Sequence, residues 1–208
     1  VGLGFLMPLD LLVSCVLFFF FYKSQYLIGS IIGLDSMPGY PYQYEQNIGA
    51  YTGICVLAIW TTRPQILSAF RQAIGYVKAT DRSEPMRYRT AFSGIIFGGI
   101  FLILFVARGG MDIWIATLFF LAHFTIAITL TRIRAEIGLP IHSTTFIGPH
   151  HSLVSLLGTR KIGANNLTWF SLFFWFNRDN RSHPMPHQLK AFKLSEQAQL
   201  DLKGMSRS

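Results

Sequence analysis

The sequence predicts an all-α integral membrane protein, a polytopic bundle of transmembrane helices. Of its 208 residues, 51% are hydrophobic, 15% aromatic and only 13% charged, which is outside the usual range for a soluble domain. Its apolar runs are long enough to cross a hydrocarbon core of about 30 Å. The 18 Lys and Arg residues outnumber the 10 Asp and Glu, but they fall mostly between the apolar runs, where they set membrane orientation. We therefore expect membrane lipid as a partner, and no nucleic acid.

Four apolar runs are the predicted spans. The first exceeds the ~20 residues that a span needs, whereas the second is short and has a soft boundary. Arg63–Pro64 ends the second run and begins an amphipathic stretch that we expect near the membrane surface. The turn Ala107–Asp112 makes the last two runs an antiparallel hairpin. The four runs cover about residues 5–34, 47–62, 90–106 and 113–133.

Basic residues predict the orientation of these spans. The loop 76–89 carries Lys78 and three arginines, so the positive-inside rule places it in the cytoplasm. The fourth run ends at a basic segment on the same side. We expect a bacterial cytoplasmic (inner) membrane protein with a cytoplasmic tail, residues 178–208, that contains an amphipathic helix over Leu189–Lys203. The first run lacks the features of a signal peptide, and we expect this single transmembrane domain to be a portion of a longer chain.

The pattern changes after Pro140. The apolar pieces Ser152–Leu157 and Leu167–Phe176 are each too short to cross the membrane. One interpretation of 141–177 is a re-entrant or broken-helix segment, which is tolerated at membrane depth where protein or a water-filled cavity surrounds it. The other is a fifth, tilted span over Ile162–Phe176. The prediction is therefore four to five spans.

Ionisable residues inside the spans are the candidate functional residues. Lys23 lies near the middle of the first run, where a charge costs roughly 2.5–3.5 kcal/mol on insertion scales. It either faces protein or water, or it extends to the surface from a span that ends near Tyr22. His123 lies mid-span and can form a hydrogen bond between helices or relay a proton. With residues near the irregular segment they form the predicted substrate-binding set: Lys23, His123, Arg134, Glu136, His142, His150 and His151.

Several kinds of chemistry lack a sequence signal. The adjacent His150 and His151 have no second cluster of defined spacing, and no haem-attachment, zincin, Walker or dinucleotide motif is present. Cys15 and Cys55 lie inside apolar runs and imply no disulfide. No carboxylate pair or nucleophile with a positioned base can be identified from spacing. We expect no metal, no cofactor and no enzyme activity.

Three spans contain Gly-x-x-x-Gly, which places two glycines on one helix face and lets a neighbouring backbone approach. Together the three motifs predict a tightly packed bundle. The predicted helix-packing residues are Gly29, Gly33, Gly49, Gly53, Gly94 and Gly98.

Three stretches resemble a known family: Phe5–Leu12, Arg132–Pro140, and Trp175–Arg178 continuing through Arg181–Leu189. The family consists of large, uncharacterised bacterial multi-pass membrane proteins and is known as a domain of unknown function. The run Ser-His-Pro-Met-Pro-His-Gln is the most specific part of the resemblance. Because family members are several times longer, the resemblance implies that this is one portion. More distantly, Arg132 to Pro149 is similar to oligopeptide-transporter-type carriers, in which a span with a basic end leads into an irregular segment.

Two functions remain open at this stage. One is a transporter-like protein that moves a small solute or peptide across the inner membrane. The other is a non-catalytic accessory subunit of a respiratory or photosynthetic membrane complex, and either could be a homo-oligomer or part of a larger assembly. If the protein is a transporter, the polar residues should converge on a water-accessible cavity. If it is an accessory subunit, each polar residue should form its hydrogen bonds separately at a helix contact.

Overall fold

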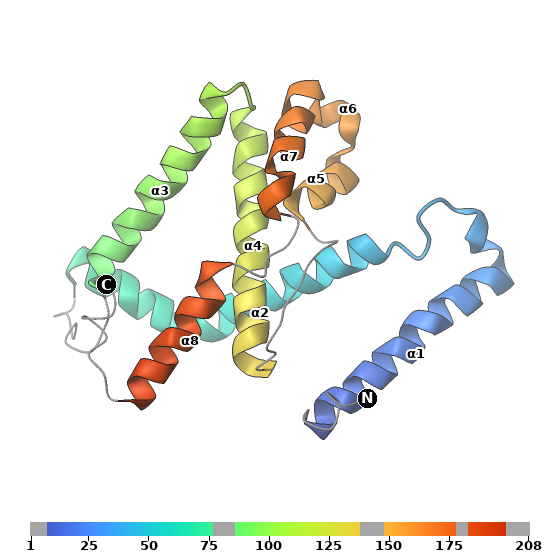
Figure 1. Ribbon diagram of the computed structural model, residues 1–208, viewed down its shortest axis with the longest axis horizontal. Coiled ribbons are helices and arrows are strands. Elements are labelled where there is room, and N and C mark those ends of the chain that lie inside the picture. Colours follow the sequence, from blue (N-terminus) through green and yellow to red (C-terminus); the bar gives the residue numbers. More distant parts are fainter. Residues whose placement is uncertain (1–7, 77–85, 138–147, 178–182, 199–208) are drawn as a thin grey trace. The chain divides into compact units, whose positions relative to one another are not determined.

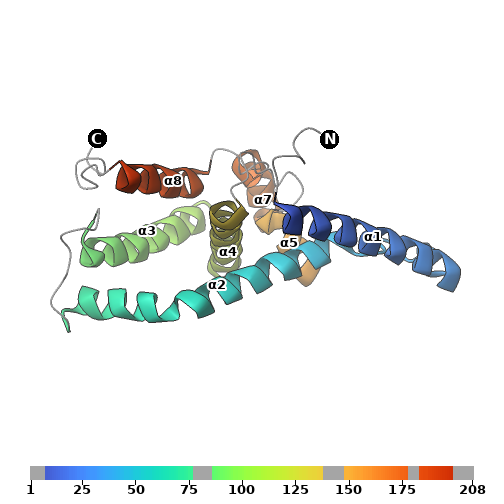
Figure 2. The same ribbon diagram turned by 90° about the horizontal axis from the view of Figure 1, so that it is seen from below.

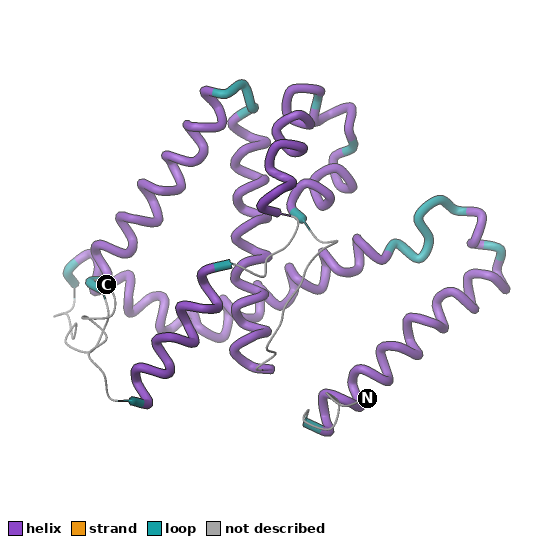
Figure 3. The backbone as a smooth tube through the Cα atoms, viewed as in Figure 1, coloured by secondary structure: helices purple, strands orange, loops and turns teal. Residues whose placement is uncertain are grey.

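The computed structural model describes residues 8–76, 86–137, 148–177 and 183–198, and within them every regular element is helical (Figures 1 and 3). The all-α prediction is confirmed. The chain divides into two compact units, Val1–Gln46 and Asn47–Ser208. The helices are α1 (Leu9–Ile32), a 3₁₀ turn (Leu34–Ser36), α2 (Gln43–Ile74), α3 (Tyr88–Arg108), α4 (Ile113–Ile137), α5 (Pro149–Leu157), α6 (Thr159–Ile162), α7 (Ala164–Asn177) and α8 (Pro184–Gln197).

Three of the described helices are long and apolar enough to cross a membrane: α1, α3 and the Ile113–Glu136 part of α4. They coincide with the first, third and fourth predicted runs. The region of the second run differs, because α2 is one helix of 32 residues that continues through Pro64. The helix therefore does not end at Arg63–Pro64, and the prediction that the span ends there and an amphipathic stretch begins stays a prediction. A proline removes one backbone donor without ending a helix whose other bonds form, and Figure 2 shows α2 curved but continuous.

The first unit consists of α1, the loop after it and the first turn of α2. The Tyr40 ring lies directly against Gly29, where a Cβ atom would overlap it, and the Tyr40 hydroxyl donates to the Gln25 carbonyl over 2.8 Å. Gly33, with φ of 79°, ends α1 in the left-handed conformation that glycine favours. In this unit, Gly29 therefore makes room for a tyrosine and Gly33 terminates the helix.

The core of the second unit lies where α4 meets the α3–α4 turn, α5, α6 and α7. Phe119 of α4 is fully buried, and its ring stacks on Phe170 and Phe173 of α7 with centroids 5.4 and 5.1 Å apart. Ring stacking adds to the burial of apolar area, which is the main stabilising term here. The buried cluster is Val106, Met111, Ile115, Ala116, Phe119, Leu153, Ile162 and Phe170.

Two glycines shape the short helices that cover this core. Gly158 and Gly163, with φ of 76° and 80°, separate α5 from α6 and α6 from α7. A residue with a Cβ rarely adopts this conformation, so glycine is the residue that allows the chain to turn at both positions. Figure 1 shows α5, α6 and α7 beside the half of α4 that is nearest to the α3–α4 turn.

A polar clamp fixes the start of α7 to that turn. Asn166 is 2% exposed, and its side-chain amide donates to Asp112 Oδ2 at 2.8 Å and to the Ile162 carbonyl at 2.6 Å. Its Oδ1 accepts the Asp112 backbone N–H at 2.9 Å, and Trp169 Nε1 donates to the Gly109 carbonyl at 3.1 Å. Because the amide is fully used, this end of α7 lies level with the start of α4.

The amphipathic helix of the tail begins earlier than predicted, at Pro184 instead of Leu189. His183 caps it, since its Nδ1 accepts the Met185 N–H at 3.3 Å. Pro184 and Pro186 lie in the first turn, where no N–H is needed for an intrahelical bond, and so they start the helix. Figure 2 looks nearly along α4 and shows α8 on one side of it and α2 on the other.

Candidate functional site

The candidate site surrounds α4, a full-length candidate span whose neighbours are short. With 25 residues, α4 is about 38 Å long, and His123 lies about 15 Å from its first residue. By the same rise α5 measures about 13 Å, and α7 and α8 about 21 Å each. None of the three reaches the ~30 Å of a hydrocarbon core. Helix ends are therefore brought beside the middle of α4.

Contacts along α4 show which ends these are. The second half of α7 reaches the level of Phe119 and Phe120, both of which contact the Phe173 ring. His183, at the start of α8, contacts His123 with ring centroids 6.1 Å apart. So α7 runs from the α3–α4 turn to near the middle of α4, and α8 begins near that level and continues along the second half.

The contact between α4 and α8 contains four basic or imidazole side chains, here called the α4–α8 seam: His123, Arg134, His183 and His187. Arg134 is 7% exposed, and its Nη1 lies 3.4 Å from His187 Nε2. His183 and His187 are four residues apart, so both lie on the same face of α8. The structure thus brings two predicted residues together with two that were not in the predicted set.

Glu136 belongs to a different pair. Its Oε1 lies 2.6 Å from Arg132 Nη2, and both side chains are substantially exposed. The two residues are one helical turn apart, and such an exposed ion pair stabilises a helix by about 0.3–0.5 kcal/mol. Although Arg134 and Glu136 are near in sequence, Glu136 forms its ion pair with Arg132.

His150 and His151 lie at the start of α5 with ring centroids 4.4 Å apart. The His150 ring is packed against Gly148, where a Cβ would collide with it, and meets Phe174 edge-on at 5.6 Å. Its Nδ1 and Nε2 are buried and form no hydrogen bond within the described residues. Burial, and next the charge of His151, lowers the pKa of His150 to about 4, so this imidazole, which lies outside the candidate spans, is neutral at neutral pH.

Beside these histidines is a cavity between α5 and α7. It measures about 460 Å³ and is mostly apolar, with Ser171 as a further polar group. The Ser171 hydroxyl already donates to the Leu167 carbonyl at 3.2 Å, so its oxygen remains as an acceptor. The lining residues are His150, His151, Val154, Leu167, Phe170, Ser171 and Phe174.

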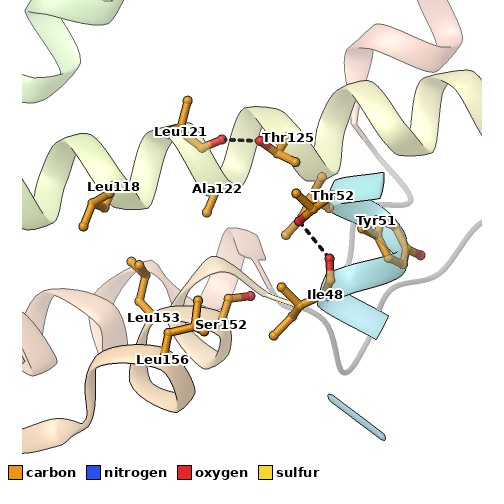
Figure 4. A pocket seen from close by; sticks show the side chains of 11 residues that line it. Ile48, Tyr51, Thr52, Leu118, Leu121, Ala122, Thr125, Ser152, Leu153 and Leu156 are labelled. Atoms are coloured by element: carbon orange, nitrogen blue, oxygen red, sulfur yellow. Dashed lines mark hydrogen bonds between the residues drawn. The ribbon is translucent and has the colours of Figure 1, made fainter. Parts of the chain in front are cut away.

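A second, smaller pocket lies between α2, α4 and α5 (Figure 4). Its volume is about 220 Å³. The hydroxyls of Thr52 and Thr125 donate to carbonyls of their own helices, Ile48 at 2.8 Å and Leu121 at 2.9 Å. The pocket therefore suits an apolar group. It is lined by Ile48, Tyr51, Thr52, Leu118, Leu121, Ala122, Thr125, Ile126, Ser152, Leu153 and Leu156.

Other predicted site residues lie elsewhere. Lys23 is on α1 in the first unit, with its Nζ 5.7 Å from the Phe19 ring centroid and 6.0 Å from that of Tyr22, both on its own helix. His142 lies outside the described residues. Within the described part of the chain, no group of three His, Cys, Asp or Glu side chains could hold a metal ion.

The remaining predicted packing glycines have open surroundings. A Cβ placed on any of them would meet nothing within 4 Å in the described residues. Helix packing through these faces therefore stays a prediction and requires a neighbour other than the described helices. The glycines concerned are Gly49, Gly53, Gly94 and Gly98.

Sequence reasoning missed His183 and His187 as site residues. Their signal was present, because a pair at i, i+4 in the Ser-His-Pro-Met-Pro-His-Gln run lies on one face of any helix that starts at the prolines. Starting the helix at Leu189 concealed it. The Asn166–Asp112 clamp had no comparable signal, since 54 residues separate the two.

Comparisons with known proteins give one match. A family model described as "Family of unknown function (DUF6785)" matches residues 1–207. No curated protein and no solved structure matches the chain. The resemblance to a family of unknown function is thereby confirmed, and the distant similarity to oligopeptide carriers stays a prediction. The chain belongs to the DUF6785 family of unknown function.

Proposed function

We propose that this chain forms part of a transporter-like protein that moves a small solute or peptide across the membrane. The observation that carries the proposal is the set of short helices that end beside the middle of α4, a helix long enough to span the membrane. Secondary transporters commonly build their substrate sites from discontinuous helices near the bilayer midplane.

The physical reason is the unsatisfied backbone at a helix end. The first four N–H groups and last four C=O groups of a helix have no intrahelical partner, and lipid cannot bond them. Such ends are tolerated at membrane depth only where protein or water surrounds them. Here the ends carry polar side chains, with His150 and His151 at the start of α5 and His183 at the start of α8.

The composition of α8 supports water on one side of α4. Lys193 and Glu196 form an exposed ion pair at 2.8 Å, and Lys190 lies one turn earlier. Hydrocarbon does not solvate such side chains. We infer that the half of α4 covered by α8 borders an aqueous vestibule, which the predicted orientation would open to the cytoplasm.

The re-entrant interpretation of 141–177 is part of this proposal. A fifth span made by α7 is less well supported, because the helix has only 14 residues and a crossing needs about 20. Apart from Lys23 and Glu136, the described residues of the predicted substrate-binding set lie in two groups, the α4–α8 seam and the His150–His151 pair. We propose that these groups lie along one route past the middle of α4.

An accessory-subunit role is the second candidate, favoured by one observation. Only 6% of the apolar stretch of α3 is buried, and its Gly94 and Gly98 face open space. A partner helix could occupy this surface. This role would not explain the discontinuous helices.

Cysteine accessibility in membrane vesicles tests the water-lined route. In full-length protein with Cys15→Ser and Cys55→Ala, a single cysteine is placed either at Ser171, which lines the cavity, or at the adjacent exposed Leu172. We expect a membrane-impermeant maleimide to label Ser171→Cys from the aqueous phase at least tenfold faster than Leu172→Cys. Equal protection of both would contradict the route.

Transport itself is measured in proteoliposomes with radiolabelled alanyl-alanine and a panel of single amino acids and tripeptides. We expect accumulation of at least one of them above that of empty liposomes. Purification of the protein in fixed ratio with other polypeptides, together with no uptake of any probe, would support the accessory-subunit role instead.

A further inference from the structure

We propose that the second half of α2, from Trp60 to Ile74, lies in the plane of the membrane surface and binds anionic phospholipid headgroups through Arg63 and Arg71. This inference goes beyond the proposed function and is independent of it, because it concerns the lipid and not a transported solute. Three observations carry it: the attachment of α2 to the ends of two candidate spans, the order of residues around the helix, and the charge of the segment.

The last turns of α2 are attached to the start of α3, a candidate span that begins at Tyr88. Arg89 Nε of α3 donates to the Ala73 carbonyl of α2 at 3.0 Å. One turn away, the Phe92 ring meets the Phe70 ring edge-on, with centroids 5.7 Å apart. A span begins where the chain enters the hydrocarbon core, so these contacts place the end of α2 at a membrane surface.

The same half of α2 also meets the last turns of α4. Thr62 and Ile66 of α2 line a pocket of about 280 Å³ together with Arg132 and Ala135 of α4. Because a short turn joins α3 to α4 as a helical hairpin, the start of α3 and the end of α4 lie at the same membrane surface. Figure 2, which looks nearly along α4, shows α2 running across it. The second half of α2 therefore lies level with that surface.

Residues of this half of α2 are separated by the side of the helix on which they lie. Large apolar side chains spaced three, four or seven residues apart share one face, and each is at least 48% exposed: Trp60, Leu67, Phe70 and Ile74. The opposite side carries exposed polar residues, Thr61, Gln65 and Ser68. Such a helix lies in a membrane interface with its apolar face in the acyl chains and its polar face in water.

Two exposed arginines accompany the apolar face: Arg63 follows Trp60 by three residues, and Arg71 follows Leu67 by four. The Arg63 Cζ atom lies 4.4 Å from the Trp60 ring centroid, a cation–π contact. Stacking uses the face of the guanidinium, whereas its five N–H donors lie in its plane and match the oxygens of a phosphate. Tryptophan rings favour the headgroup level, so the stacked pair lies where lipid phosphates are.

The charge of the segment selects an anionic lipid over a neutral one. The sequence from Gln46 to Thr80 contains three basic residues, Arg63, Arg71 and Lys78, and no Asp or Glu. Each basic residue beside a membrane strengthens the binding of anionic lipid by about fivefold. An acidic protein segment would complement the same charge, but the exposed apolar face beside the arginines fits acyl chains, so we assign the surface to lipid.

Tryptophan quenching in nanodiscs that contain the full-length protein tests the site. The probe is tail-brominated phosphatidylglycerol as a minor component of phosphatidylcholine, compared with brominated phosphatidylcholine at the same fraction. The signal of Trp60 is the difference between each protein and its Trp60→Phe version. We expect a preference for phosphatidylglycerol of at least about fivefold at Trp60. The double variant Arg63→Gln, Arg71→Gln should reduce that preference to less than about twofold.

Two variants serve as controls for the loss of charge. Arg108→Gln makes the same change at an exposed residue at the other end of α3 and should leave the preference at Trp60 unchanged. Arg63→Lys keeps the charge and should retain most of the preference. Equal quenching by the two brominated lipids, an unchanged preference in the double variant, or an equal loss with Arg108→Gln would each overturn the proposal.

A second measurement tests the placement in the membrane plane. Single cysteines replace Leu67 or Ser68 in full-length protein with Cys15→Ser and Cys55→Ala, and a membrane-impermeant maleimide is added to inside-out vesicles. We expect Ser68→Cys to be labelled at least tenfold faster than Leu67→Cys, and equal rates would contradict the placement. An acidic polypeptide that purifies with the protein in fixed ratio and is lost from the double variant would also overturn the proposal, because the partner would then be a protein.

Discussion

Helices α3 and α4 are joined by a short turn, have similar lengths and are both apolar enough to cross a membrane. Their surroundings nevertheless differ. Only 6% of the apolar stretch of α3 is buried in the described structure, compared with 39% of that of α4. Figure 1 shows α4 beside the short helices α5, α7 and α8, with α3 at the outer edge of its unit.

This difference shows that the apolar composition of a helix makes it able to cross a membrane but does not determine which other helices pack against it. Lipid tails are as apolar as leucine, so hydrophobicity alone does not drive helices together within a bilayer. What distinguishes α4 is shape and polar bonding: the Phe119 stack, the Asn166 clamp beside its first turn, and Thr129. Each of these features can be removed by a substitution, and the same kind of substitution at a position that lacks the feature serves as a control.

The largest effect is expected from Phe119→Ala. Phe119 is 0% exposed and stacks on two rings of α7, so its removal leaves a cavity that the short helices cannot easily fill. We expect a loss of about 3–5 kcal/mol in the free energy of unfolding, measured by detergent titration. Phe97→Ala on α3, where the ring is 72% exposed, should cost within about 0.5 kcal/mol. Similar losses at both positions would mean that α3 is buried in the intact protein.

The next effect is that of Asn166→Ala. It removes three hydrogen bonds at the start of α7 and leaves the Asp112 backbone N–H without its described acceptor. We expect a loss of about 2–3 kcal/mol by the same titration. Asn165→Ala, one residue earlier on an exposed side chain, is the matched control and should be nearly neutral. If both variants behave alike, α7 is held to α4 by apolar contacts alone.

A smaller effect is expected from Thr129→Val. The Thr129 hydroxyl is fully buried and donates to the Tyr51 carbonyl of α2 at 2.8 Å, so valine keeps the shape and loses one bond between helices. The expected cost is about 1 kcal/mol in unfolding free energy. Thr125→Val, whose hydroxyl bonds within α4, should cost less than half as much. The reverse order would show that α2 is not held to α4 through Thr129.

The smallest effect on stability is expected on α3 itself. Gly94→Leu and Gly98→Leu place side chains in open space, so the melting temperature in detergent should change by no more than about 1–2 °C. If these glycines pack against another subunit, however, the variants should lose that subunit on gel filtration in mild detergent. Gly99→Leu, off the Gly-x-x-x-Gly face, is the control. An unchanged elution volume for all three would make the surface a lipid contact.

Much of the fold could be predicted from local sequence. Runs of apolar residues identified α1, α3 and α4 because the hydrocarbon core requires a continuous apolar stretch. The α2 region was predicted less well, since the short run 47–62 and the amphipathic stretch after Arg63–Pro64 form one continuous helix. The start of α8 was predicted at Leu189, five residues late, although the first turn of a helix accepts the two prolines that begin it.

The candidate site could be predicted only in part. His123 was identified from its place in an apolar run, which marks an ionisable residue as exceptional, and Arg134 from its place at the basic end of that run, next to the irregular segment. Their proximity to His183 and His187 could not be predicted, because the contacts join residues 60 and 53 positions apart. The spacing between helices in the sequence does not determine which helices pack against each other.

The sequence by itself determined the all-α class and, among its four predicted runs, three that form helices long and apolar enough to cross a bilayer, because each follows from local composition and from the thickness of lipid. The tertiary structure alone decided that α4 and not α3 gathers the short helices, that the buried Arg134 meets His187, and that His123 meets His183. Those outcomes depend on shape complementarity and on polar bonds between distant residues, such as those of Asn166 with Asp112, and no local pattern encodes them.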